Sequence, residues 1–196
     1  MPVSATTSAP VIVVSGLPRS GTSLMMSMLQ AGGVPIVTDA QRTADDDNPN
    51  GYFELERVKQ LSRGDCEWVS EAHGKAVKVI SALLEHLPAT STYKVVFMRR
   101  RLPEVLASQR KMLERRGEPT DAVPDAMMAS LFERHLQKIE GWMAAQPNIS
   151  VLYVPYHEVA EQPETFVDQI ITFLGLDLDR ARMLAAVNPA LYRNRA

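Results

Sequence analysis

The segment VIVVSG at residues 11–16 constrains the fold more than any other part of the sequence. A short, uncharged, β-branched run that ends in glycine is typical of a strand buried on both faces of a parallel sheet. A tight loop leads from it into residues 22–33, where apolar side chains recur at helical spacing and Gly32 and Gly33 supply a stop. The order strand, tight loop, helix predicts an α/β domain.

The same alternation continues along the chain. It predicts further strands at 75–81, 94–98 and 149–154, and helices at 53–62, 102–113, 125–146 (capped by Asp125), 163–175 and 178–186. Residues 38–52 are the most polar segment and predict a surface loop, and residues 1–10 predict a loose leader. We therefore expect one domain over residues 1–196, a three-layer α/β sandwich with a mainly parallel central sheet and right-handed crossovers.

Composition excludes several classes of protein. With 45% apolar and 22% charged residues among 196, the chain has a globular rather than a disordered composition. A net charge of −2 provides no general attraction for nucleic acid or an anionic membrane, and no apolar stretch approaches the ~20 residues of a membrane span. The single cysteine, Cys66, cannot form an intramolecular disulfide and fits a reducing compartment. We expect a cytoplasmic protein without an anchor.

The loop after the first strand is the candidate binding site. Gly16 and Gly21 are five residues apart between a buried strand and a helix, where free N–H groups and the helix dipole favour an anion. The spacing matches the phosphate loop G-x-x-x-x-G-K-[ST], but Thr22 stands where the lysine is required, which argues against ATP or GTP as a phosphoryl donor. Arg19 is the cation within the loop, and a guanidinium can bind two oxygens of a phosphate or sulfate. A purely structural turn is the alternative.

Three segments together resemble the sulfotransferases that use 3′-phosphoadenosine 5′-phosphosulfate (PAPS). The family's loop P-[KR]-[ST]-G-[ST]-[ST] is matched by Pro18, Arg19, Ser20, Gly21, Thr22 and Ser23, in a form similar to the tyrosylprotein and bacterial branches. A strand ending in arginine is followed by a serine eight residues later, matched by Arg100 and Ser108. Residues 151–176 resemble a third segment, which puts Tyr156 where the family has a tyrosine near the adenine.

The resemblance implies a nucleotide-binding fold of the P-loop type and a set of roles. It implies that Gly21, Thr22 and Ser23 bind the 5′-phosphate and that Arg19 neutralises charge on the bridging oxygen as sulfuryl leaves. Arg100 and Ser108 would select the 3′-phosphate, with Arg99 or Arg101 as alternatives to Arg100. PAPS would be the donor and PAP the product, without a metal.

The general base is less well defined by the sequence. In the cytosolic branch a histidine follows a strand-end lysine by two residues, but here Ile80 follows Lys78. Lys78 is a candidate to face the sulfuryl group, with a surface lysine as the alternative. By resemblance to the tyrosylprotein branch, Asp39 is the first candidate base and Glu54 the second, although each is equally consistent with a solvated acid. The histidines have no metal-ligand spacing, and we expect no metal site; they are His73, His86, His135 and His157.

The chain ends without the Arg-Lys-Gly segment that closes over the 3′-phosphate in cytosolic members, and Arg193 or Arg195 is a candidate substitute. The predicted function is transfer of a sulfuryl group from PAPS to a hydroxyl or amine of a small-molecule or peptide acceptor. A PAPS-binding or PAP-binding protein without catalysis, a nucleotide-kinase-like phosphotransferase and a structural protein that binds no nucleotide are the alternatives. Acceptor identity and oligomeric state have no recognisable signal in the sequence.

Overall fold

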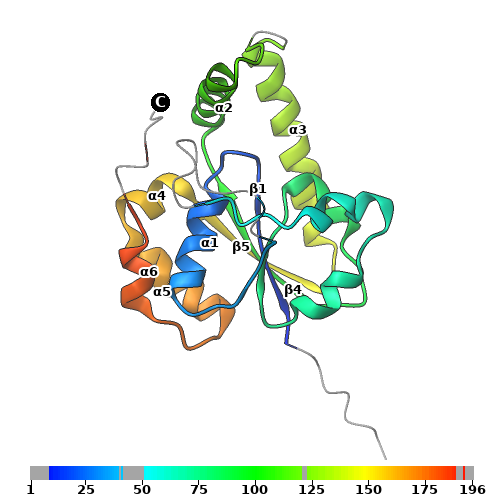
Figure 1. Cartoon of the computed structure of the whole chain (residues 1–196), viewed down its shortest axis with the longest axis vertical. Coiled ribbons are helices and arrows are strands. Elements are labelled where there is room, and N and C mark those ends of the chain that lie inside the picture. The colour runs from blue at the N-terminus through cyan, green and yellow to red at the C-terminus, as the bar shows by residue number, and fades with distance from the viewer. Residues whose placement is uncertain (1–8, 40, 42–50, 121–122, 189–191, 193–196) are drawn as a thin grey trace, which may run out of the picture.

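A five-stranded sheet forms the centre of the molecule (Figure 1). The computed structural model describes residues 9–39, 41, 51–120, 123–188 and 192. All strand pairs are parallel, and the order across the sheet is β2-β3-β1-β4-β5. The strands are β1 (Val11–Gly16), β2 (Ile36–Val37), β3 (Ala76–Lys78), β4 (Tyr93–Arg99) and β5 (Ile149–Pro155). The predicted parallel α/β sheet is confirmed.

The two faces of β1 separate two hydrophobic cores. Val11 and Val13 pack into one cluster and Ile12 and Val14 into the other, because successive side chains of a strand point to opposite faces. Figure 1 shows the helices that cover each face. On one side lie α1 (Thr22–Ala31), α4 (Tyr156–Glu161), α5 (Pro163–Leu174) and α6 (Arg180–Ala185). On the other lie α3 (Asp125–Ala144) and three 3₁₀ segments, η1 (Glu56–Arg63), η2 (Glu67–Ala72) and η3 (Ser81–His86).

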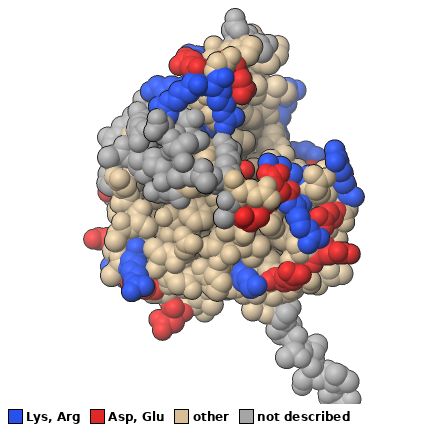
Figure 2. All heavy atoms as spheres, in the orientation of Figure 1, with Lys and Arg blue, Asp and Glu red and all other residues tan. Residues whose placement is uncertain are grey.

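Helix α2 (Leu102–Arg116) follows β4 and rises with α3 beyond the carboxyl ends of the strands (Figure 1). In the face drawn in Figure 2, lysine and arginine side chains gather at this upper end of the molecule, over α2. Exposed basic residues of α2 include Arg110, Lys111 and Arg116. The carboxyl edge of the sheet, where ligands bind in open α/β folds, therefore has local positive charge despite the net charge of −2.

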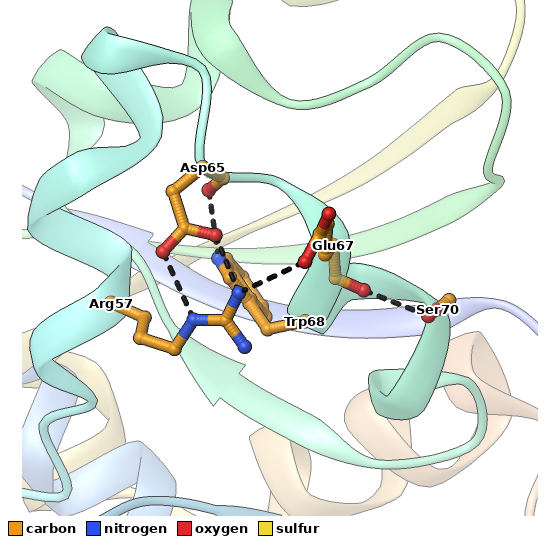
Figure 3. Close-up of polar contacts among 5 residues, drawn as sticks. All are labelled: Arg57, Asp65, Glu67, Trp68 and Ser70. Atoms are coloured by element: carbon orange, nitrogen blue, oxygen red, sulfur yellow. Dashed lines mark hydrogen bonds and ion pairs between the residues drawn. The ribbon is translucent and has the colours of Figure 1, made fainter.

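Polar contacts connect two of the 3₁₀ segments, η1 and η2 (Figure 3). Arg57 of η1 donates to both carboxylate oxygens of Asp65, at 2.9 Å from Nε and 2.6 Å from Nη2. Trp68 of η2 donates from Nε1 to the Asp65 carbonyl at 3.2 Å. The hydrogen bond from Arg57 lowers the pKa of the Asp65 carboxyl. These contacts hold η1 to η2 over the sheet face that contains Val11 and Val13.

Two predicted elements differ from those observed. The helix predicted at 53–62 is a 3₁₀ segment that begins only at Glu56, because the Glu54 carbonyl accepts hydrogen bonds from Thr38 Oγ1 and the Asp39 amide. The strand predicted at 75–81 ends at Lys78. Tertiary contacts overrode the local helix propensity of the first segment. In the second, Ser81 already belongs to η3, and its hydroxyl contacts His135 of α3.

Asp125 was predicted to cap the long helix, and this was wrong. Pro124 occupies the cap position, without a side-chain hydrogen bond, and Asp125 is the first helical residue. Its carboxylate instead pairs with Arg110 of α2. The sequence also gave no prediction of β2, η2, η3 or α4. Most of the predicted leader, residues 40 and 42–50 of the predicted surface loop, and both Arg193 and Arg195 lie outside the described residues.

Candidate active site

The loop between β1 and α1 is a tight turn that requires its glycines. Gly16 has φ 146° and Gly21 has φ 100°, conformations that L side chains rarely adopt. A Cβ on Gly21 would lie 2.2 Å from Cδ2 of Tyr156, and a Cβ on Gly16 would lie 2.6 Å from the Met98 carbonyl oxygen. The loop is thus packed directly against β4 and α4.

The start of α1 has the chemistry of an anion site. The helix begins without a side-chain cap and without an acidic residue in its first turn. Its first amides have no carbonyl partner within the helix and lie at the positive end of the helix dipole. Ser20 Oγ, buried in the loop, has no hydrogen-bond partner among the described residues. A buried polar atom without a partner is uncommon and fits a site that is completed by a ligand.

The structure brings the loop and the strand-end arginine motif together. Arg19 Nε donates to Ser108 Oγ at 3.0 Å, and Arg100 Nη1 donates to the Arg19 carbonyl at 3.1 Å. Arg19 has φ 68°, which is unfavourable for a residue with a Cβ. Contacts to both its carbonyl and its side chain stabilise this conformation.

Of the three consecutive arginines, Arg100 is the one that reaches the loop. Arg99 points elsewhere, because its Nη2 pairs with Glu140 of α3 at 2.6 Å and its guanidinium lies 4.3 Å from the Tyr153 ring centre. Arg101 is largely exposed, with 56% of its side chain accessible. Arg100, the arginine that the spacing favours, is thus the one that contacts the loop.

Tyr156 lies at the loop. It is the first residue of α4, is 7% exposed, and its ring covers Gly21. The guanidinium carbon of Arg100 is 4.6 Å from the ring centre, within the range of a cation–π contact. Tyr156 thus connects α4 to both the loop and Arg100.

Sequence reasoning missed two residues at this site, Glu104 and Tyr192. Glu104 is 0% exposed and accepts hydrogen bonds from Arg100 Nε at 3.0 Å and from the Tyr192 hydroxyl at 2.7 Å. Glu104 could have been found from the sequence, because it lies four residues before Ser108 in the predicted helix and such residues share one helix face. No sequence pattern singles out Tyr192.

A second cluster surrounds Lys78 at the end of β3. Its Nζ donates to Ser23 Oγ of the α1 start at 3.2 Å and to the Tyr52 carbonyl at 2.7 Å, and it lies 3.9 Å from Glu54 Oε1. The Lys78 side chain is only 10% exposed, so it is not an ordinary surface lysine. Phe53 has φ 51°, and with Arg19 it accounts for the non-glycine residues of positive φ in the described part of the chain. Both such residues flank the site, as strained residues commonly do.

Asp39 is engaged with backbone amides. Its Oδ2 accepts from the Glu56 N–H at 2.6 Å and its Oδ1 from the Gln41 N–H at 3.0 Å. These hydrogen bonds, the one from Glu56 most strongly, lower the pKa of Asp39. A lower pKa means a weaker base, and the contacts identify Asp39 as the residue that fixes the start of η1.

The histidines and the remaining acids form no metal cluster in the described part of the chain. His135 of α3 has Nε2 at 2.8 Å from Ser81 Oγ, and burial lowers its pKa, so the ring is mostly neutral near pH 7. Across the same residues, no helix has the length and apolar character needed to cross a membrane.

Several solved structures with a similar fold are sulfotransferases. The sulfotransferase domain of the Synechococcus olefin synthase is 15% identical, with a TM-score of 0.56, covering 97% of this chain and 89% of its own. A Mycobacterium tuberculosis sulfotransferase is 18% identical, with a TM-score of 0.58, covering 94% and 73%. A mouse sulfotransferase complexed with PAP is 17% identical, with a TM-score of 0.56, covering 96% and 66%. At such identities these matches show a shared fold.

The family is shown by a sequence comparison. No curated protein sequence matches the chain significantly. The family model of the sulfotransferase domain, however, matches residues 9–194, nearly the whole chain, including the loop, Arg100 and Ser108. This chain belongs to the sulfotransferase-domain family and is an enzyme of the sulfuryl-transfer class.

Proposed function

We propose that this enzyme transfers a sulfuryl group from PAPS to a hydroxyl or amine of a small-molecule or peptide acceptor and releases PAP. The observation that carries the proposal is the meeting of two sequence motifs, in which Arg19 of the loop contacts both Arg100 and Ser108. Family membership and Thr22 in place of the phosphate-loop lysine disfavour the kinase-like alternative. Membership also disfavours a binding protein without catalysis.

The donor roles follow from position. Amides at the start of α1, with Ser20 and Thr22 beside them, would bind the 5′-phosphate. Arg100 and Ser108 would bind the 3′-phosphate, which distinguishes PAPS from ATP, and Tyr156 would lie at the adenosine side of Arg100. Ser108 and Arg19 are already within hydrogen-bond distance, so the two phosphate sites are adjacent.

The transfer step would be an in-line displacement. The acceptor oxygen or nitrogen forms a bond to sulfur while the bond from sulfur to the bridging oxygen breaks, and that oxygen takes the electron pair. Arg19 would neutralise the charge that grows there, a type of electrostatic stabilisation that is typically the largest catalytic term. Lys78, in contact with Ser23, would face the sulfuryl group.

For the base, we propose Glu54 in preference to Asp39. Glu54 lies 3.9 Å from Lys78, which itself contacts the α1 start, whereas both Asp39 oxygens accept backbone hydrogen bonds. A base must lie within reach of the acceptor proton, and Glu54 is the acid that the contacts link to the donor loop. The acceptor proton would pass to this carboxylate.

The proposed donor is tested by calorimetric titration with PAP, AMP and ATP with magnesium. We expect PAP to bind more tightly than the other two. Ser108→Ala should weaken the binding of PAP by about tenfold, because a hydrogen bond to a charged group is lost. The affinity for AMP should stay nearly unchanged. Ser130→Ala, an exposed serine on α3, is the control and should bind as the wild type does. Preference for ATP with magnesium would contradict the proposed function.

The proposed base is tested by two isosteric substitutions. Glu54→Gln should lower kcat by about 10²- to 10⁴-fold, the usual contribution of general base catalysis, whereas Asp39→Asn should leave kcat largely intact. Turnover is followed with sulfur-labelled PAPS and a panel of hexanol, a phenol and hexylamine. Hydrogen bonds lower the pKa of Asp39, so with Asp39 as the base the rate would fall only below the ordinary pKa of an aspartate. A rate that falls with acid above this range contradicts Asp39 as the base. A larger loss of kcat in Asp39→Asn than in Glu54→Gln would identify Asp39 as the base.

A cytoplasmic location is part of the same proposal. Its support is the single cysteine, Cys66, which is half-buried and free and fits a reducing compartment.

A further inference from the structure

The buried carboxylate of Glu104 connects distant parts of the chain. Its Oε2 accepts from Arg100 Nε, and its Oε1 accepts from the hydroxyl of Tyr192, which is 88 residues away in sequence. A carboxylate with 0% exposure is stable only when it is paired and hydrogen-bonded. Each of its oxygens therefore has a different partner, one in the donor site and one near the end of the chain.

Tyr192 also packs against the guanidinium of Arg100, to which Glu104 is hydrogen-bonded. Its ring meets the Tyr156 ring edge-on at 5.3 Å, and the Arg100 guanidinium carbon lies 5.7 Å from the centre of Tyr192 and 4.6 Å from that of Tyr156. Burial, and secondarily the contact with Glu104, raises the pKa of the Tyr192 hydroxyl. The hydroxyl therefore remains protonated at neutral pH and donates to the carboxylate. Two rings and one ion pair fix the plane of the Arg100 guanidinium.

The guanidinium so fixed contacts the donor loop. Arg100 Nη1 donates to the carbonyl of Arg19, the loop residue with φ 68°. A continuous series of contacts thus runs from Tyr192 through Glu104 and Arg100 to the loop. Glu104 lies within ion-pair distance of two guanidinium groups, at 3.0 Å from Arg100 and 4.0 Å from Arg101. One carboxylate cannot neutralise both, so the cluster keeps a net positive charge.

We propose that Glu104 and Tyr192 are positioning residues, which orient Arg100 for the 3′-phosphate and so set the preference for 3′-phosphorylated nucleotides. The proposal rests on the proposed function, in which Arg100 binds that phosphate. A guanidinium binds phosphate through N–H groups in one plane, so its orientation decides the strength of the contact. When folding has already fixed the side chain, binding does not bear the entropic cost of ordering it.

The test uses Tyr192→Phe in the full chain, which removes the hydroxyl and keeps the ring. Calorimetric titration should show that the affinity for PAP falls by about tenfold and that the affinity for AMP changes by less than about twofold. The reason is that a hydrogen bond to a charged group is lost only on the 3′ side. The matched control is Tyr153→Phe on β5, whose ring contacts Phe97 and Arg99 and is 36% exposed. The control should bind both nucleotides as the wild type does.

Each outcome decides between distinct possibilities. If the wild-type chain itself does not bind PAP, the proposed function fails and this inference with it. If the wild type binds PAP and Tyr192→Phe binds it equally well, the positioning roles are overturned and the proposed function stands. Equal weakening of PAP and AMP would show a general loosening of the site and would also overturn the positioning roles.

A second variant tests the coupling between the two residues. Glu104→Gln keeps the side-chain volume and removes the charge. It should likewise weaken the binding of PAP more than that of AMP. In the double variant the two losses should be less than additive, because both residues act through Arg100. Full additivity would overturn the coupling. Thermal unfolding shows which variants fold, and the Tyr192→Phe result stands alone if the buried charge of Glu104 proves essential for folding.

Discussion

Replacing Arg19 by alanine is expected to lower kcat for sulfuryl transfer by about 100- to 1000-fold, the usual cost of removing one group that stabilises transition-state charge. The guanidinium lies in the loop and is held by Ser108 at 3.0 Å, at the junction of the proposed 5′ and 3′ phosphate sites. Without it, no other cation within the loop can neutralise the bridging oxygen. The measurement is transfer of the labelled sulfuryl group from PAPS to the acceptor panel, with PAP affinity measured in parallel.

A second variant separates loss of charge from backbone strain. Alanine at the φ of Arg19, 68°, is itself unfavourable by about 1–2 kcal/mol, whereas glycine adopts this conformation readily. Arg19→Gly should therefore lose as much kcat as Arg19→Ala while the loop keeps its geometry. Near wild-type turnover in Arg19→Gly would show that Arg19 acts through the backbone and not through its charge.

Gly21→Ala is expected to weaken the binding of PAP by about a hundredfold, since overpacking costs about 1–3 kcal/mol and left-handed strain about 1–2 kcal/mol. The added Cβ would lie 2.2 Å from the Tyr156 ring, and the residue would keep φ 100° only under strain. The loop or α4 must move, which disturbs either the contact of Arg100 with the loop or its contact with the Tyr156 ring. Calorimetric titration with PAP measures the loss.

Gly141→Ala is the matched control for this substitution. Gly141 lies within α3, a Cβ there would meet nothing within 4 Å, and its φ is not positive. Alanine at this position should leave PAP affinity unchanged and raise stability by up to about 1 kcal/mol, because alanine favours helix more than glycine does. If Gly21→Ala binds PAP as well as Gly141→Ala does, the loop is not the donor site.

Local pattern predicted the parts of the fold that depend on local physics. The uncharged run at 11–16 became β1 with the same bounds, and Pro163 and Gly175 delimited α5 as predicted. The helix predicted at residues 53–62 was wrong in its start and its type. The pattern of these residues is amphipathic, but the Glu54 carbonyl accepts hydrogen bonds from Thr38 and Asp39, whose positions depend on the packing of a distant segment. Nothing in the pattern of residues 53–62 reports those partners.

The sequence by itself singled out the loop after β1, the strand-end Arg100 and Ser108 of α2, and it predicted the family to which the chain belongs. These residues recur at fixed spacing along a strand, a tight turn and a helix, so a local pattern is enough to find them. Only the tertiary structure distinguished Arg100 from its neighbours by contact, placed Glu54 near Lys78 and engaged Asp39 with the η1 amides. It alone brought Tyr192 to Glu104, 88 residues away. The physical reason is that hydrogen bonds between distant segments depend on how the helices pack on the sheet, and no local periodicity encodes that packing.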